Sequence, residues 1–313
     1  MKNVLFYLLT VLIWGSTWIG IKMQLGTIDP IVSVAYRFSL AALFLLCWCH
    51  FRNLSMRFSL TEHSFMALQG LLLFGFNYLL FYIAELYVTS GLAAVIFSTI
   101  LLMNMVNGAI FLKSPIDGRV IIGGILGLSG IVLVFRPEIT SYSLENDGMI
   151  GVLYCLLATL LASLGNITSA RNQRHGLPIV QTNAFGMGYG ALAMYLVILL
   201  AGKPLALDLS PVYMGSLLYL ALFGSVIAFG CYLTLVGNIG ADRAAYATLL
   251  FPIVALLIST VWEGYLWTVS SAVGVALILL GNLWMLNRKH SVTPRPNVFR
   301  SLLHVLRISP NKS

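Results

Sequence analysis

Charged residues in this sequence stand in short clusters, and the apolar runs between them are each about 20 residues long, the length of one bilayer crossing. No charged residue lies between Lys2 and Lys22, and charged residues make up only 9% of the chain. A soluble protein carries about a quarter charged residues. An α-helix of about 20 residues spans the hydrocarbon core of a bilayer. The pattern therefore predicts an all-α integral membrane protein that crosses the bilayer many times.

The spacing of the clusters predicts ten transmembrane helices. We place them at residues 4–23, 31–50, 64–86, 91–112, 119–136, 149–170, 181–201, 212–236, 242–262 and 268–287. Proline lacks a backbone donor and is best tolerated in the links between such helices. Among the ten prolines, Pro252 alone lies in the middle of a predicted helix.

Basic residues are distributed unequally between the two sides of these helices. With a cytoplasmic N-terminus, fourteen of the eighteen Lys and Arg residues lie on the cytoplasmic side, and the other side holds Lys22, Arg37, Arg136 and Lys203. Because cytoplasmic loops carry an excess of Lys and Arg, we expect both termini in the cytoplasm. The net charge of +8 then reflects this asymmetry and not nucleic-acid binding. The basic cytoplasmic tail 288–313 is either an amphipathic helix on inner-leaflet lipid or a frayed segment.

The second half of the chain echoes the first. A shift of 151 residues places small residues on small residues: Ala93 and Ala94 on Ala244 and Ala245, Gly123 on Gly274, and Gly130 on Gly281. We expect one five-helix repeat over 1–140 and another over 149–287. Because five is odd, the two copies enter the membrane from opposite sides. Inverted repeats around a central cavity are typical of secondary transporters.

Two segments of the first half resemble a known transporter group. The opening LLTVLIWGSTWIGIKMQLG and the segment AYRFSLAAL around Arg37 resemble the drug/metabolite transporter superfamily, and within it the EamA family. Pro252, Glu263 and the helix with Gly274 and Gly281 are also similar. The resemblance covers residues 1–287. It implies a ten-helix basket with a central cavity, which in many members exports amino acids or related metabolites.

The first half departs from the family pattern in one helix. Family members usually carry a second mid-helix Pro and a second terminal Glu in the segment 91–112. Leu101 and Leu112 stand at these positions. This departure indicates that the two halves have diverged.

The sequence contains no signature of an enzyme. It has no HExxH zinc motif, no GxSxG nucleophile elbow and no P-loop for ATP. The five histidines lack the spacing of metal ligands. We therefore predict no catalytic residues, no metal and no cofactor.

Neutral polar and aromatic residues inside the predicted helices are the candidates to line a cavity and bind substrate. Each has a competing role, because Ser, Thr and Asn in membrane helices commonly bond to a backbone carbonyl or to a neighbouring helix. The candidates are Trp14, Ser16, Thr17, Asn77, Tyr78, Tyr82, Ser98, Asn104, Asn107, Ser163, Asn166, Ser225, Tyr232, Tyr246 and Thr248.

Four further residues are candidates for gating or coupling. Arg37, Glu85 and Glu263 are predicted near the outer ends of their helices, within reach of the interface, so that no carboxylate is buried at mid-membrane. A proton is the candidate coupling ion, and coupling would have to use Glu85 or Glu263. Pro252 could loosen its helix, because proline leaves a carbonyl without a partner.

Together these observations predict a secondary transporter in a bacterial inner membrane. It would export a small neutral or zwitterionic metabolite, such as an amino acid, by alternating access, with lipid and substrate as its partners and as a monomer or homodimer. The alternatives are a facilitator or a drug-efflux protein of the same superfamily, and a membrane sensor or enzyme that does not transport.

Overall fold

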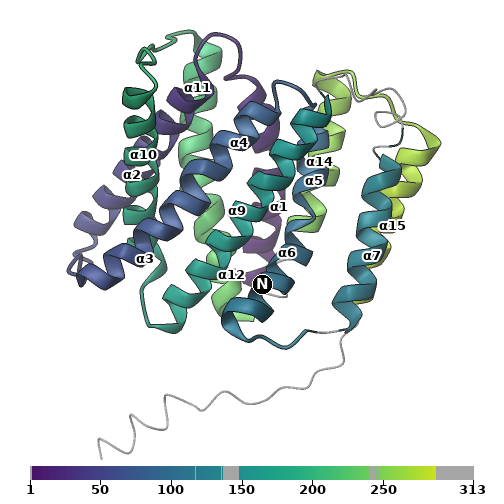
Figure 1. Cartoon of the computed structure of the whole chain (residues 1–313), viewed down its shortest axis with the longest axis horizontal. Helices are drawn as coiled ribbons and strands as arrows, with labels where there is room; N and C mark the ends of the chain where they lie inside the picture. The colour runs from purple at the N-terminus through teal and green to yellow at the C-terminus, as the bar shows by residue number, and fades with distance from the viewer. Residues whose placement is uncertain are drawn as a thin grey trace, which may run out of the picture.

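The computed structural model describes residues 2–116, 118–134, 136, 148–239, 244 and 247–286. These residues form a bundle of helices, and they contain no β-strand (Figure 1). The predicted tail 288–313 and Tyr246 lie outside the described residues.

The first half of the chain forms five helical runs, two of them interrupted. The elements are α1 (Lys2–Lys22), α2 (Pro30–Phe51), α3 (Leu60–Gly70), η1 (Leu71–Gly75), α4 (Phe76–Ala84), α5 (Ser90–Phe97), α6 (Ile100–Leu112) and α7 (Gly118–Val134). The second half contributes α9 (Gly148–Arg174), α10 (Ile179–Leu200), α11 (Pro211–Tyr219), η2 (Leu220–Ile227), α12 (Ala228–Ile239), α14 (Ala247–Trp262) and α15 (Val269–Leu286).

Capping residues fix where several of these helices begin. Asp29 precedes Pro30 and accepts a hydrogen bond from the Ile31 amide at 3.2 Å, so that α2 starts at a proline whose missing donor costs nothing there. Ser210 and Pro211 begin α11 in the same way. Pro30 and Pro211, which were predicted to lie in the links, are therefore the first residues of α2 and α11 in the structure.

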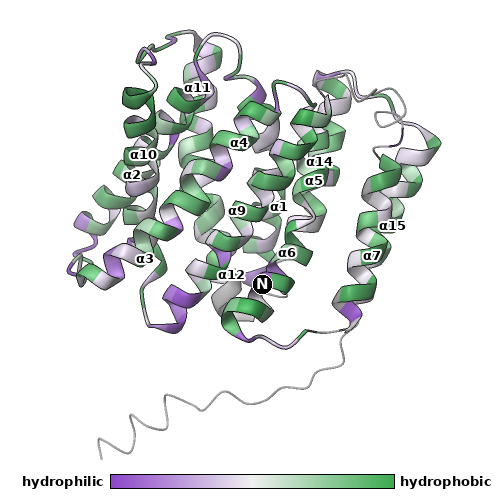
Figure 2. Ribbon diagram, viewed as in Figure 1, coloured by the Kyte–Doolittle hydropathy of each residue, from purple (hydrophilic) through white to green (hydrophobic). Residues whose placement is uncertain are grey.

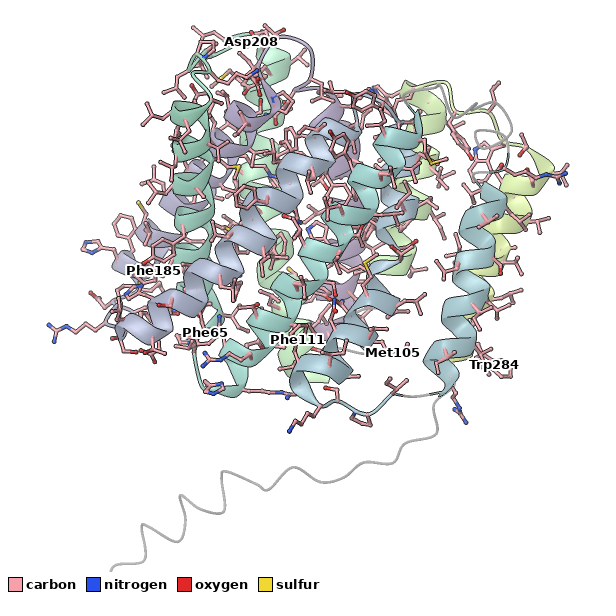
Figure 3. All side chains as sticks on the ribbon, viewed as in Figure 1. Phe65, Met105, Phe111, Phe185, Asp208 and Trp284 are labelled. Atoms are coloured by element: carbon pink, nitrogen blue, oxygen red, sulfur yellow. The ribbon has the colours of Figure 1, made fainter. Side chains whose placement is uncertain are left out.

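Seven of the described helical runs are long and apolar enough to cross a membrane, and three shorter apolar helices accompany them. Apolar residues cover the outside of the bundle along its whole length, and the hydrophilic ones gather at its two ends (Figure 2). Large apolar side chains face outward, including Phe111 at 61% exposure and Trp284 at 52% (Figure 3). Such a surface is stable in lipid and not in water. The chain is a multi-pass membrane protein.

Two helices form the centre of the packing. α1 contacts α12, α14 and α5, while α9 contacts α4, α6 and α3. α2 packs on α10 at one side of the bundle, and α7 packs on α15 at the other (Figure 1). The α7–α15 contact is close, because a Cβ on Gly274 would lie 2.5 Å from the Gly130 carbonyl oxygen. Small residues allow this approach.

Two of the long helices contain a π-helical segment that the sequence analysis did not predict. η1 separates α3 from α4, and η2 separates α11 from α12. A π-helical turn leaves backbone groups without their usual α-helical partners, and it often marks a functional site. In η2 the hydroxyl of Ser225 donates a hydrogen bond to the Leu220 carbonyl at 3.0 Å.

Candidate functional site

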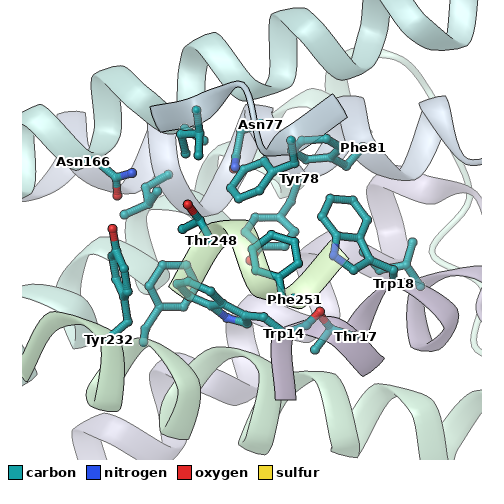
Figure 4. Close-up of a pocket in the computed structure, with 16 residues that line it drawn as sticks. Trp14, Thr17, Trp18, Asn77, Tyr78, Phe81, Asn166, Tyr232, Thr248 and Phe251 are labelled. Atoms are coloured by element: carbon teal, nitrogen blue, oxygen red, sulfur yellow. The ribbon is translucent and has the colours of Figure 1, made fainter. Parts of the chain in front are cut away.

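Side chains from both halves of the chain enclose a narrow cavity of about 50 Å³ in the middle of the bundle (Figure 4). This volume is enough for a few water molecules. Half of the lining residues are aromatic: Trp14, Trp18, Tyr78, Phe81, Phe97, Phe229, Tyr232 and Phe251. Aromatic rings therefore narrow the cavity in this conformation, and they would have to part to admit a solute larger than water.

Ring contacts hold the aromatic wall together. The Trp14 ring centroid lies 5.0 Å from that of Phe229 and 4.9 Å from that of Tyr232. The indole nitrogen of Trp14 donates a hydrogen bond to the Gly224 carbonyl at 3.2 Å, which fixes the orientation of the ring. Edge-on and tilted ring pairs at these distances are favourable. This arrangement joins α1 to η2 and α12.

Four polar side chains interrupt the aromatic wall: Thr17, Asn77, Asn166 and Thr248. They come from α1, α4, α9 and α14 (Figure 4). Asn77 is 3% exposed, and its Oδ1 atom has no hydrogen-bond partner. A buried amide oxygen without a partner is an acceptor that a solute can use.

A buried positive charge lies behind one wall of the cavity. The Arg37 guanidinium carbon is 4.4 Å from the ring centroid of Tyr78, which lines the cavity, and the side chain is 1% exposed. Its Nε donates to the Ser225 hydroxyl at 3.1 Å, while Nη1 has no partner. No carboxylate of the described residues forms an ion pair with it. The prediction that Arg37 reaches the interface is wrong, because α4 and η2 cover it.

Gly224 makes room for this charge. A Cβ at position 224 would lie 3.2 Å from Arg37 Nη2 and 2.7 Å from Thr17 Cγ2. Arg37, Thr17 and the Trp14 hydrogen bond thus all meet at one residue of η2. A side chain there would displace the charge or the cavity wall.

Seven of the predicted candidates line the cavity: Trp14, Thr17, Asn77, Tyr78, Asn166, Tyr232 and Thr248. Trp18 and the four phenylalanines of the wall were not predicted, because their rings carry no polar signal distinct from packing. Helical spacing was an available signal. Residues 14, 17, 18 and 21 share one face of α1 and all line the cavity.

Other predicted candidates bond within or between helices instead. The hydroxyls of Ser16 and Tyr219 are 2.5 Å apart. Tyr82 donates to Gln24 Oε1 at 2.6 Å. The Ser98 hydroxyl donates to the Val95 carbonyl of its own helix. None of the three predicted residues lines the cavity.

Four more candidates, Asn104, Asn107, Ser163 and Ser225, likewise do not line the cavity. Asn107 on α6 donates to the Ser163 hydroxyl on α9 at 2.8 Å. Ser225 accepts from Arg37. Asn104 has a buried Oδ1 without a partner but does not line the cavity.

The two predicted coupling carboxylates lie in different surroundings at one end of the bundle. Glu263 faces an open groove with Lys22 and Thr89. Glu85 directly follows α4 and is 0% exposed, and neither of its carboxyl oxygens has a hydrogen-bond partner. The prediction that Glu85 reaches the interface is therefore wrong. The start of α9 covers it, because Gly151 packs against the Ala84 carbonyl.

The comparison with known proteins names the family. The profile of the EamA-like transporter family matches residues 1–136 and 149–287. The chain belongs to the EamA-like transporter family. The family and two of the three relatives below are named as transporters, and none of them is named as an enzyme.

Two relatives match over nine-tenths or more of both chains, and a third matches over about four-fifths. Protein PagO of Salmonella typhimurium is 26% identical over 94% of this chain and 95% of its own length. An uncharacterized transporter of Clostridium kluyveri is 24% identical over 90% of this chain and 92% of its own. The uncharacterized inner membrane transporter YedA of Escherichia coli K12 is 27% identical over 80% of this chain and 79% of its own.

A solved crystal structure has the same fold. It superposes with a TM-score of 0.70 at 16% sequence identity, and the match covers 90% of this chain and 95% of the other. This likeness bears on the fold alone.

Proposed function

We propose that this protein is a secondary transporter that exports a small neutral or zwitterionic metabolite, such as an amino acid, by alternating access. The observation that carries the proposal is the narrow central cavity, whose walls come from both halves of the chain. A solute bound there would lie between the two halves. Opening the bundle to one side at a time would move it across.

The chemistry of the cavity supports the substrate class. Aromatic residues make up half of the cavity lining and suit an apolar or aromatic side chain. Asn77, with its unpaired oxygen, can accept a hydrogen bond from an ammonium group. Arg37 places a positive charge behind Tyr78, where it would favour a carboxylate in the cavity. An amino acid combines all three groups.

We further propose ten transmembrane helices in two inverted repeats, over 1–140 and 149–287. The contacts support this arrangement, since α1 packs on α12 and α14 as α9 packs on α4 and α6. The π-helical segments η1 and η2 stand in the third helical run of each half. The separate family matches to the two halves are consistent with it.

The charges support cytoplasmic termini. In the bundle the N-terminus lies toward the end that carries the α9–α10 link, and Asp208 lies at the opposite end (Figures 1 and 3). Arg171 and Arg174 occupy the last turn of α9, on the N-terminal side. Excess basic charge marks the cytoplasmic side. We propose a bacterial inner membrane as the location, since the relative YedA is named as an inner membrane transporter.

One alternative has an observation in its favour. The aromatic residues of the cavity would also bind an apolar drug, so drug efflux is the second candidate function. The two candidates differ in what the buried Arg37 does, because an apolar cation would be repelled by it.

The test is untargeted mass spectrometry of the medium around cells that do or do not overexpress the protein. We expect selective accumulation of a few carboxylate-bearing metabolites. A Trp14→Ala/Tyr78→Ala double variant should abolish it, because both side chains line the cavity. Leu12→Ala is the matched control, since Leu12 lies on the outer face of the same helix. A medium unchanged by overexpression would contradict export, and accumulation of apolar cations would favour drug efflux.

A further inference from the structure

Glu85 is the least expected side chain of the bundle. Its residue is fully buried, and both carboxyl oxygens lack a partner. Buried charged groups in proteins are normally paired or hydrogen-bonded, because burial removes the water that stabilises the charge. An ionised Glu85 would therefore strongly destabilise this conformation, whereas a protonated Glu85 would not carry that penalty.

Glu263, at the same end of the bundle, has a carboxylate that is stabilised by hydrogen bonds. It accepts hydrogen bonds from the Ser90 amide at 3.2 Å, from the Ser90 hydroxyl, and from the Ser259 hydroxyl at 2.6 Å. It also lines the open groove. Two carboxyls of one region thus have opposite environments, an arrangement that separates an ionised group from a protonated one.

The charged and titratable groups around Glu85 do not neutralise it by contact. The Lys22 ammonium group donates a hydrogen bond to the main-chain carbonyl oxygen of Glu85 at 2.6 Å. Arg37 bonds to Ser225, and Tyr82 donates its hydroxyl to Gln24. The groups that face Glu85 from the elements around it are Lys22 of α1, Arg37 of α2, Tyr82 of α4, Cys155 of α9 and Glu263 after α14.

We propose that Glu85 is the proton-binding site that couples transport to a proton gradient, an inference that rests on the proposed function. The carboxylate takes up a proton when the end of α4 is open to water, and the carboxylic acid returns it to water on the other side after the bundle has reoriented. No other bond forms or breaks. The solute leaves the cell as the proton enters.

This conformation explains why the two movements are linked. The unpaired oxygens of Glu85 disfavour it when the carboxylate is ionised, so the solute-free bundle passes through it readily only with the proton bound. The return of the solute-free protein then carries a proton inward after each solute has left the cell. Glu263 holds α5 to the end of α14 through Ser90 and Ser259.

The first test does not need the solute. Infrared spectra of the purified full-length protein in lipid nanodiscs would be recorded at neutral pH, and the C=O stretch of a protonated carboxylic acid would be measured. We expect this band in the wild type, its loss in Glu85→Gln, and its retention in Glu263→Gln. Thermal melting would check that both variants fold. A band that survives in Glu85→Gln, or no band in the wild type, would overturn the proposal.

The second test measures coupling in proteoliposomes with a mixture of the twenty standard amino acids as the probe. A pH gradient should drive accumulation by the wild type and by Glu263→Gln. Glu85→Gln should lose accumulation yet keep exchange of amino acids across the membrane. Gradient-driven accumulation by Glu85→Gln would refute the coupling role. If no amino acid moves in any variant, the proposed substrate class fails and with it the coupling role argued from it, while the infrared band still decides whether Glu85 holds a proton.

Discussion

The guanidinium of Arg37 lies against the outer side of the Tyr78 ring, 4.4 Å from its centroid, while the same ring forms part of the cavity wall. We expect this charge to select carboxylate-bearing solutes. In Arg37→Gln the preference for an amino acid over the corresponding amine, measured as the ratio of kcat/KM values in proteoliposomes, should fall about tenfold or more. The charge acts through the ring and not by contact with the solute, and about 1.4 kcal/mol of electrostatic attraction is a factor of ten.

Lys203→Gln provides the control for this change of charge. Lys203 pairs with Asp29 at 2.9 Å and is half exposed, far along the chain from the cavity residues. Its replacement should leave the ratio unchanged. Equal ratios in wild type and Arg37→Gln would show that Arg37 only packs.

Gly224 should tolerate no side chain. In Gly224→Ala the new methyl group would lie 2.7 Å from Thr17 Cγ2 and 3.2 Å from Arg37 Nη2. Overpacking of this kind costs about 1–3 kcal/mol. We expect a lower Tm and reduced transport. Gly230→Ala is the matched control on the same helical run, because no atom of another residue lies within 4 Å of the place that its methyl group would take; a Tm loss as large in Gly230→Ala would argue against the crowding account.

The Asn107–Ser163 hydrogen bond should stabilise the bundle without affecting selectivity. It joins α6 to α9 at 2.8 Å, and neither residue lines the cavity. A double-mutant cycle of Asn107→Ala and Ser163→Ala, measured by unfolding in detergent, should give a coupling energy of about 0.6 kcal/mol. Substrate preference should not change in any of the variants. A shift in preference would place Asn107 in the transport pathway after all.

Pro252 should speed the opening of the cavity. Pro252 lies inside α14. Thr248 and Phe251, which precede it in the same helix, both line the cavity. Pro252→Ala restores a backbone donor and should stiffen the helix. Adding about 1.4 kcal/mol to the opening barrier would slow turnover about tenfold. Turnover numbers from initial rates, compared with Tm, provide the measurement, and unchanged rates would rule out gating by this residue.

The helices were predictable because their sequence signals are local. Apolar length and helix-starting prolines such as Pro30 and Pro211 act within a few residues. Neutral polar residues such as Asn77 and Asn166 were predicted at the cavity because a polar group inside a membrane helix needs a reason to be there. Among such groups, however, the sequence does not distinguish one that faces the cavity from one that bonds to a neighbouring helix.

The burial of Arg37 and Glu85 was not predictable from their place near helix ends. It depends on which segments cover those ends, namely η2 over Arg37 and the start of α9 over Glu85. The π-helical segments were missed for a related reason. The five residues of η1 and the eight of η2 have no sequence pattern that distinguishes a π-helix from an α-helix. Hydrogen bonds such as that of Ser225 to the Leu220 carbonyl depend on the folded backbone.

Gly224 gives the transport cycle one further property. The residue accepts the hydrogen bond of Trp14, touches Thr17 and borders the guanidinium of Arg37. A displacement of η2 relative to α1 would therefore widen the cavity and withdraw the positive charge in a single movement. The solute would lose its enclosure and its electrostatic anchor at the same moment, so that release would be all or none, and rapid-mixing experiments would record one kinetic phase for dissociation.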